Sequence, residues 1–199
     1  MFRQFVLSVS LIVLVIVAAW TTMHWVMAPE QEVAAPQLLP PGGDFTVLTA
    51  DGPLSLSDLQ GEVVVLYFGY AYCPDVCPTD LSVMRLALNG LEQPEQEKVR
   101  GLFVSVDPDR DTPESLGEFA GYFHDRMIGA THSVDELKRI TRQYAAGFII
   151  DPHEPGENYT VSHTASTYVI DPRGELRETL SHASDPAALT AAIRRYLPN

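Results

Sequence analysis

Residues 62–79 carry the strongest structural pattern of the chain and read Glu-Val-Val-Val-Leu-Tyr-Phe-Gly-Tyr-Ala-Tyr-Cys-Pro-Asp-Val-Cys-Pro-Thr. The first seven residues are a continuous run of mainly β-branched and aromatic side chains, which is typical of a strand buried on both faces. A loop with two cysteines follows at 69–78. We expect Thr79 to cap a helix that continues to about Leu88. The stretch therefore predicts a strand, a cysteine loop and a helix in direct succession.

Outward from this stretch, strand and helix patterns alternate along the chain. The expected elements are a hairpin at 45–56, a second buried strand at 100–106, helices at 112–123 and 133–144 (the latter opened by a capping box at 133–136), a hairpin at 166–180 and a last helix at 185–196. Buried strands joined by crossover helices pair in parallel, and the last hairpin adds an antiparallel edge. The order predicts an α/β, thioredoxin-like fold with added hairpins, whose chemistry lies on the loop after the first core strand.

The first 27 residues differ from the rest of the chain in charge and hydropathy. Arg3 is their one charged residue, and residues 5–27 are almost wholly apolar. A helix of this length spans about 35 Å, enough for the ~30 Å hydrocarbon core of a bilayer. We therefore expect four parts: a cytoplasmic stub at 1–4, a transmembrane anchor at 5–27, a linker rich in Pro and Gly at 28–43, and the folded domain at 44–199.

A cleaved signal peptide is the alternative to an anchor, because Val17-Ala18-Ala19 resembles a small-residue cleavage site. The apolar stretch continues past this point to Met27, which favours the anchor. Both interpretations export the domain. Since no leader rich in Arg and Ser precedes the apolar stretch, we expect a single-pass protein of a bacterial inner membrane with its domain in the periplasm.

The chain is strongly acidic, with a formal net charge of −13. Beyond residue 27 it carries 12 basic and 26 acidic side chains. Such a surface repels phosphate backbones, which argues against nucleic-acid binding. It suits a cationic ligand or a basic partner, although solubility alone explains the charge equally well.

Cys73 and Cys77 are the two cysteines of the chain, and three residues separate them where a thioredoxin motif has two. On a helix, this spacing puts the Cβ atoms ~5–6 Å apart on one face, so that both sulfurs can chelate one ion. They form a disulfide only if the loop relaxes, because bonded Cβ atoms lie ~3.8 Å apart. A purely structural bridge is a weak explanation, since so short a loop gains only roughly 2 kcal/mol. The amino end of a helix favours thiolates, and Asp75 opposes this but helps to hold a cation.

Two thiolates call for a third ligand, and His163 is the candidate among the six histidines. It lies just before the strand of the last hairpin, on a loop that faces the cysteine loop in a thioredoxin-like sheet. A thioredoxin has a cis-proline there, packed against its sulfurs. No proline lies between Gly156 and Pro172, and we interpret Ala165 as filling that position, which leaves the sulfurs open to an imidazole. Two thiolates and an imidazole suit soft or borderline ions and modestly favour copper over zinc.

Three blocks of sequence resemble the signature of the Sco/SenC family: CPDVCP at 73–78, DPDRDTP at 107–113 and VSHTASTYVIDP at 161–172. They occur in this order, and the resemblance covers residues 45–196. It implies a copper chaperone that supports assembly of cytochrome c oxidase, with Cys73, Cys77 and His163 as ligands of Cu(I) or Cu(II). The dinuclear copper site of oxidase subunit II is the implied target, and another periplasmic copper chaperone is a candidate partner.

The resemblance also suggests a supporting or relay role near the metal for Asp107, to which Asp75 is added as a second candidate. The alternative for Asp107 is a turn organised with Arg110 and Asp111. A competing function is an envelope thiol–disulfide oxidoreductase whose redox dithiol, Cys73 and Cys77, reduces the cysteines of subunit II or of another protein. A peroxidase-like or redox-sensing domain is a third hypothesis. Whether the protein is an enzyme depends on this choice, since a metallochaperone as such is not one.

Overall fold

The computed structural model describes Val17, Trp20 and residues 41–154 and 158–198. The chain divides into two units, Met1–Leu38 and Leu39–Asn199. The anchor, the cleavage site and the linker predicted for the first 43 residues lie outside the described residues, apart from Val17, Trp20 and 41–43. Within the part of the chain that is described, no helix is both long and apolar enough to cross a membrane.

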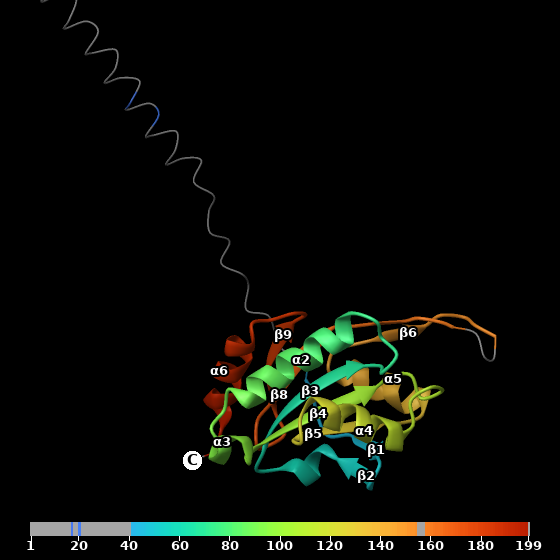
Figure 1. The fold of residues 1–199 in the computed structure, drawn as a ribbon, viewed down its shortest axis with the longest axis horizontal. Helices are drawn as coiled ribbons and strands as arrows, with labels where there is room; N and C mark the ends of the chain where they lie inside the picture. The colour runs from blue at the N-terminus through green and yellow to red at the C-terminus, as the bar shows by residue number, and fades with distance from the viewer. Residues whose placement is uncertain (1–16, 18–19, 21–40, 155–157, 199) are drawn as a thin grey trace, which may run out of the picture. The chain divides into compact units, whose positions relative to one another are not determined.

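The second unit is built on a seven-stranded sheet with the order β2-β1-β5-β4-β3-β8-β9 (Figure 1). Its strands are β1 (Thr46–Thr49), β2 (Gly52–Ser55), β3 (Val63–Gly69), β4 (Val99–Ser105), β5 (Met127–Thr131), β8 (Ser166–Ile170) and β9 (Leu176–Ser181). The three central strands β3, β4 and β5 are parallel, and the outer strands pair antiparallel. The predicted α/β class is thus confirmed, and β3 is an inner strand, between β4 and β8, whose carboxyl end leads into the cysteine loop.

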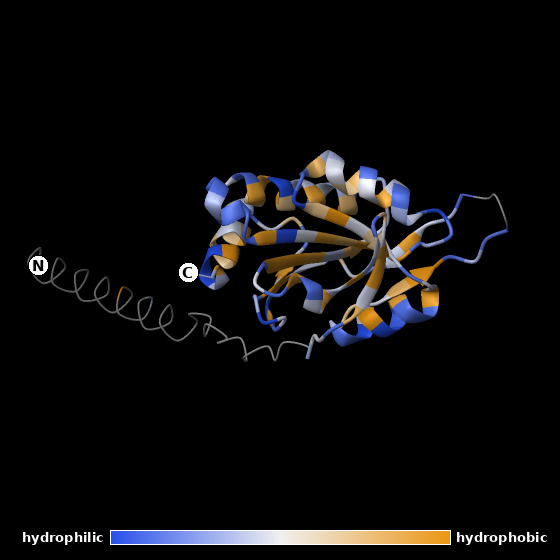
Figure 2. Cartoon of the chain, turned by 90° about the horizontal axis from the view of Figure 1, so that it is seen from below, coloured by the Kyte–Doolittle hydropathy of each residue, from blue (hydrophilic) through white to orange (hydrophobic). Residues whose placement is uncertain are grey.

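Helices cover both faces of the sheet. They are α2 (Val76–Asn89), the short α3 (Gln93–Gln96), α4 (Pro113–Phe123), α5 (Val134–Gln143) and α6 (Pro186–Tyr196), with a 3₁₀ turn, η1 (Leu56–Leu59). α2, α4 and α6 lie on one face and α5 on the other (Figure 1). Hydrophobic residues gather on the strands and on the helix sides that face them, as Figure 2 shows, while the outer helix sides are hydrophilic.

Aromatic rings fill the core beneath the strand that leads to the cysteines. Phe68 of β3 contacts the rings of Tyr144 and Tyr168, with centroids 5.9 and 5.8 Å apart. On the opposite face of the sheet, Tyr67 stacks against Phe103 of β4. All five side chains are buried. Successive residues of β3 therefore point to opposite faces, and Tyr67 faces α2, which carries Cys77.

The structure corrects the predicted start of the first helix. α2 begins at Val76 with Asp75 as its N-cap, and Thr79 already lies in the helix, donating from Oγ1 to the Asp75 carbonyl at 3.0 Å. A loop was predicted up to Pro78, because proline disrupts the interior of a helix. In the first helical turn, however, a proline is tolerated, because the N–H groups there have no partner within the helix. As a consequence Cys77 belongs to the first turn of α2.

Other differences concern elements that leave little trace in the sequence. The strand β5 was not predicted, because it is short and contains Gly129. Glycine is needed at this position, since an added Cβ would lie 2.0 Å from the Leu116 carbonyl oxygen. The prediction of a capping box at 133–136 is wrong. Ser133 is the N-cap of α5, but its side chain makes no capping hydrogen bond, and its Oγ lies 3.3 Å from His132 Nδ1.

A separate two-stranded sheet was also missed. It is a hairpin of β6 (Phe148–Ile150) and β7 (Val161–His163), paired antiparallel with Phe148 opposite His163. The hairpin extends from the main sheet (Figure 1). Its second strand ends on the histidine that the sequence singled out.

Candidate metal centre

The two cysteines lie where β3 passes into α2. The Cys73 N–H donates to the Tyr70 carbonyl at 3.2 Å, which closes the loop after β3, and the Cys77 N–H donates to Cys73 Sγ at 3.5 Å. Both cysteines are free thiols. Cys73 is 9% exposed and Cys77 is 0% exposed, so Cys77 is fully enclosed and Cys73 keeps a small exposed area.

Gly69 makes room for the enclosed sulfur. A Cβ at this position would lie 2.7 Å from Cys77 Sγ, closer than side-chain carbons approach any neighbour. Glycine is therefore required at the end of β3 by a close approach, and the sulfur of Cys77 lies directly against the backbone of the strand.

His163 approaches the same sulfur from the hairpin. Its Nε2 lies 3.3 Å from Cys77 Sγ, and its Nδ1 lies 3.2 Å from the Thr164 carbonyl oxygen. Because a carbonyl accepts and never donates, Nδ1 carries the proton and Nε2 presents its lone pair toward the sulfur. The rings of Tyr67 and Tyr70 contact the imidazole edge-on, with centroids 6.1 and 5.9 Å away.

Cys73, Cys77 and His163 therefore meet in space, as the sequence predicted. Their sulfur and nitrogen atoms all lie within 4.8 Å of one another, and among the described residues this is the group of three that is arranged to hold a metal. Two soft sulfurs and one imidazole nitrogen at this separation fit an ion such as copper, whereas zinc prefers four ligands.

The two thiols differ in acidity because they differ in surroundings. Burial works against ionisation of Cys73, but hydrogen bonds from the N–H groups of Cys77 and Asp75 and from the Cys77 thiol outweigh it, and the pKa of Cys73 lies below its usual value. Burial raises the pKa of Cys77 well above the usual thiol range. Cys73 is thus the thiol that ionises readily, and Cys77 keeps its proton until a metal or a disulfide replaces it.

The imidazole of His163 is held in the neutral form. Burial lowers its pKa, and the hydrogen bond to the Thr164 carbonyl opposes this only in part. Neutral imidazole is the form that binds metals, so this group needs no deprotonation at neutral pH.

Asp111 braces the cysteine loop, a role that the sequence did not reveal. Its Oδ2 accepts hydrogen bonds from the Ala71 N–H at 2.9 Å and from Ser105 Oγ at 2.5 Å, and the side chain is buried. Burial raises the pKa of this carboxyl group, and the two donors oppose the rise. The contact joins the loop to the segment after β4, 40 residues away. The acidic DPDRD run, interpreted as a turn, is the only signal of it in the sequence.

Asp75 and Asp107, the two predicted supporting carboxylates, are placed differently. Asp75 is exposed at the start of α2, where its peptide N–H contributes to the low pKa of Cys73. Asp107 is 0% exposed and bonds to Arg110 and Tyr159, through Oδ2 at 2.5 Å and Oδ1 at 2.6 Å. Its hydrogen bonds thus lead to the hairpin and not to either sulfur.

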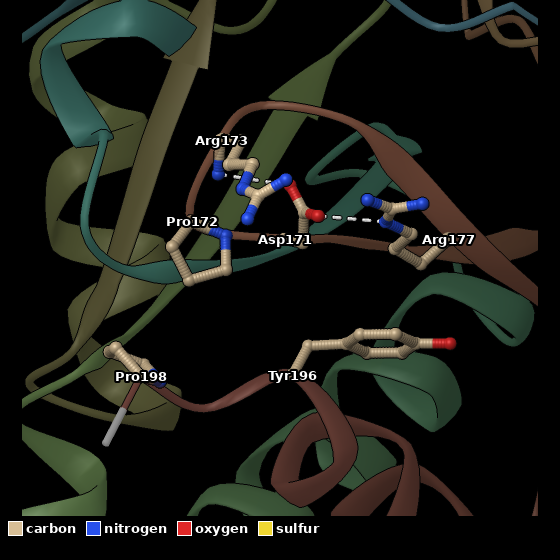
Figure 3. Close-up of a pocket in the computed structure, with 6 residues that line it drawn as sticks. All are labelled: Asp171, Pro172, Arg173, Arg177, Tyr196 and Pro198. Atoms are coloured by element: carbon tan, nitrogen blue, oxygen red, sulfur yellow. Dashed lines mark hydrogen bonds and ion pairs between the residues drawn. The ribbon is translucent and has the colours of Figure 1, made fainter.

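A surface hollow at the other end of the sheet does not involve the predicted residues. It is lined by Asp171, Pro172, Arg173, Arg177, Tyr196 and Pro198 (Figure 3). The Asp171 carboxylate accepts from Arg177 Nε at 2.7 Å and from the Arg173 and Glu175 N–H groups. These bonds close the turn between β8 and β9, so the carboxylate has a structural role.

Comparison with known sequences identifies the family. A model of the family described as SCO1/SenC matches residues 34–198. The mitochondrial SCO2 homolog of Bos taurus is 32% identical over 157 residues, which are 78% of this chain and 59% of that protein. The chain spans between 52% and 62% of the length of the first curated relatives that it matches.

Solved structures agree with the sequences. The solution structure of apo Sco1 from Thermus thermophilus has a TM-score of 0.72 and 33% identity, covering 80% of this chain and 92% of that one. Yeast Sco1 with copper bound has a TM-score of 0.72 and 31% identity, covering 79% and 88%. These matches confirm the thioredoxin-like fold. By its sequence blocks, its fold and its matched relatives, the chain belongs to the SCO1/SenC family.

Proposed function

We propose that this protein binds one copper ion through Cys73, Cys77 and His163 and supports assembly of the copper site of cytochrome c oxidase subunit II. The observation that carries the proposal is the convergence of two sulfurs and one imidazole within 4.8 Å. Yeast Sco1, which shares the fold, was solved with copper bound. Copper is the cargo of such a protein and not a resident cofactor.

The chemistry of the three groups supports Cu(I) in particular. A soft, three-coordinate ion is satisfied by two thiolates and one neutral imidazole. Binding displaces the proton that burial holds on Cys77, so the affinity rises with pH until that proton is lost. For Cu(II), a fourth ligand completes the coordination.

The proposal extends to location and partners. The apolar segment at 5–27 anchors the protein in a bacterial inner membrane, with the domain of residues 44–199 in the periplasm. The strongly acidic surface suits recognition of a basic patch on subunit II or on another copper chaperone.

Metal analysis tests the binding site. The full chain, reduced and exposed to Cu(I), is expected to retain about one copper ion, and Ala variants at positions 73, 77 and 163 are expected to bind at least ~10-fold more weakly. His124→Ala is the matched control, because His124 precedes β5 at the far end of the sheet. A parent protein that retains no copper, or a His163→Ala variant that binds as tightly as the parent, overturns the assignment.

A second function, reduction of a partner disulfide, is favoured by the unequal thiols. The Cys73 thiolate attacks the partner's disulfide and one partner sulfur leaves as thiolate. Cys77 then attacks the mixed disulfide, which oxidises the pair to a Cys73–Cys77 bridge and releases the second partner thiol. A reduction potential that copper does not change, with turnover on unrelated disulfides, would support this function over copper binding.

A further inference from the structure

We infer that Arg110 and Tyr159 are positioning residues for His163: with Asp107 they form a clasp that fixes the β6–β7 hairpin, and so holds the imidazole against Cys77. The inference rests on the proposed function for its importance to copper. Its geometry, however, stands on contacts that do not involve the metal.

Four contacts close the clasp. Arg110 donates from Nε to Asp107 Oδ2 at 2.5 Å and from Nη1 to the Tyr159 carbonyl at 2.8 Å. The Tyr159 hydroxyl donates to Asp107 Oδ1 at 2.6 Å. The guanidinium lies over the Tyr159 ring, 3.6 Å from its centroid. Two segments of chain about 50 residues apart are thereby joined around one buried carboxylate.

The hairpin needs such an attachment. Two-stranded sheets are marginally stable on their own in water, and β6 and β7 pair with each other and not with the main sheet. Its base is fixed by bonds between Gly147 and Thr164, directly beside His163. Tyr159 lies two residues before β7 and is fixed by the clasp. The strand that carries His163 is therefore held at both ends, and loss of the clasp frees one of them.

Arg110 also contacts the cysteine loop. Its guanidinium lies 5.5 Å from the ring centroid of Tyr70 and 5.3 Å from that of Tyr72. Tyr70 in turn packs edge-on against the imidazole of His163. One side chain thus touches both halves of the metal centre, the loop with the thiols and the hairpin with the imidazole.

An arginine is required by this geometry. The planar guanidinium donates in two directions at once and stacks on an aromatic ring, whereas a lysine ammonium is a single point charge. The outer face of the Tyr159 ring is covered by His153, whose ring is parallel to it at 3.6 Å. The tyrosine is therefore fixed on both faces.

The test compares copper spectra of variants of the full, reduced chain. In Arg110→Ala, we expect the imidazole nitrogen coupling in the Cu(II) paramagnetic resonance spectrum to be lost or divided among conformers, and copper affinity to fall at least ~10-fold toward that of His163→Ala. Arg110→Lys should not restore either. In the His163→Ala background, Arg110→Ala should cause no further loss, because both changes remove the same ligand.

Arg126→Ala is the matched control. Arg126 is 25% exposed against 20% for Arg110, pairs with Glu62 at 2.6 Å and donates to two carbonyls, but at the other end of the sheet. Its variant should lose stability and keep the parental copper spectrum. An Arg110→Ala protein with the parental imidazole signal and affinity overturns the inference.

Two further measurements separate the possible failures. Tyr159→Phe removes one hydroxyl and keeps the ring, so it folds and should weaken copper binding in the same direction by a smaller factor. If the parent binds no copper, the proposed function fails, and the clasp is then tested in the metal-free protein. There, Arg110→Ala should speed amide exchange at Val161 and shift the His163 ring resonances, and unchanged values for both would refute it.

Discussion

Replacing Gly69 with Ala tests the position of the enclosed sulfur more directly than any change of a ligand. The substitution keeps both thiols and the imidazole and adds one methyl group. Its Cβ would lie 2.7 Å from Cys77 Sγ, 2.9 Å from a ring carbon of Tyr67 and 3.0 Å from one of Phe103. All three neighbours are buried, so none can turn toward solvent.

The size of the effect follows from these distances. Non-bonded heavy atoms rest ~3.5–4.0 Å apart, so the sulfur must retreat by about 0.8 Å or more. Overpacking of this kind costs about 1–3 kcal/mol of unfolding free energy, and each kcal/mol lowers the melting temperature by about 2–4 °C in a domain of this size. Metal–ligand distances tolerate only about 0.2 Å, so copper binding should weaken as well.

Thermal unfolding of the reduced protein and a copper competition titration measure the two effects. Gly101→Ala on β4 is the control, since its Cβ meets Met127 Cγ at 2.6 Å, away from the thiols, and a flexible methionine can move aside. We expect Gly69→Ala to melt about 2–12 °C lower and to bind copper more weakly, and Gly101→Ala to bind it as the parent does. Parental melting and parental affinity in Gly69→Ala would refute the placement of Cys77.

Two further predictions concern stability. Burial lowers the pKa of both His163 and His124, so the folded protein keeps these side chains neutral while the unfolded chain takes up protons near pH 6.5. The unfolding free energy should therefore fall as the pH drops below about 6.5, and it should fall less steeply in His163→Ala. An identical slope for that variant in denaturant titrations would contradict this. Asp111→Ala leaves the Ala71 N–H and the Ser105 hydroxyl without their acceptor, which should lower the unfolding free energy by about 1–3 kcal/mol and speed exchange of the Ala71 amide. Asp109→Ala, on the exposed side of the same loop, is the control. Equal stability of the two variants would contradict the role of Asp111 in holding the loop.

Much of the fold could be predicted from local patterns because they are strong where the core is continuous. The run at 63–68 is buried at every residue, and Thr112 followed by Pro113 marks the start of α4 as expected. The predicted N-cap of α2, Thr79, lies four residues after the observed one, Asp75, because a proline such as Pro78 breaks a helix in its interior but is tolerated in its first turn. The strand β5 is too short, and too rich in small residues, to have a pattern of its own.

Part of the metal centre could likewise be predicted from the sequence and part could not. Its three converging groups could be predicted because their chemistry is specific, with two thiols at a chelating distance and a histidine on the facing loop. The groups that hold the ligands in place could not. Asp111 and Arg110 act across 40 and 49 residues of chain, and an aspartate or arginine in a polar loop carries no signal of the partner that burial will give it.

The unequal exposure of the two sulfurs determines how an ion can leave this centre. Cys77 lies under the strand backbone and against the imidazole, whereas Cys73 keeps a small exposed area. In a transfer of the proposed kind, a thiol of another protein would therefore meet the ion on the Cys73 side and replace that bond first, while the inner sulfur and the nitrogen stay bound. Exchange in this order would pass the ion from one set of ligands to the next without releasing it to water, so the unequal burial of the two sulfurs sets the order in which the bonds are exchanged.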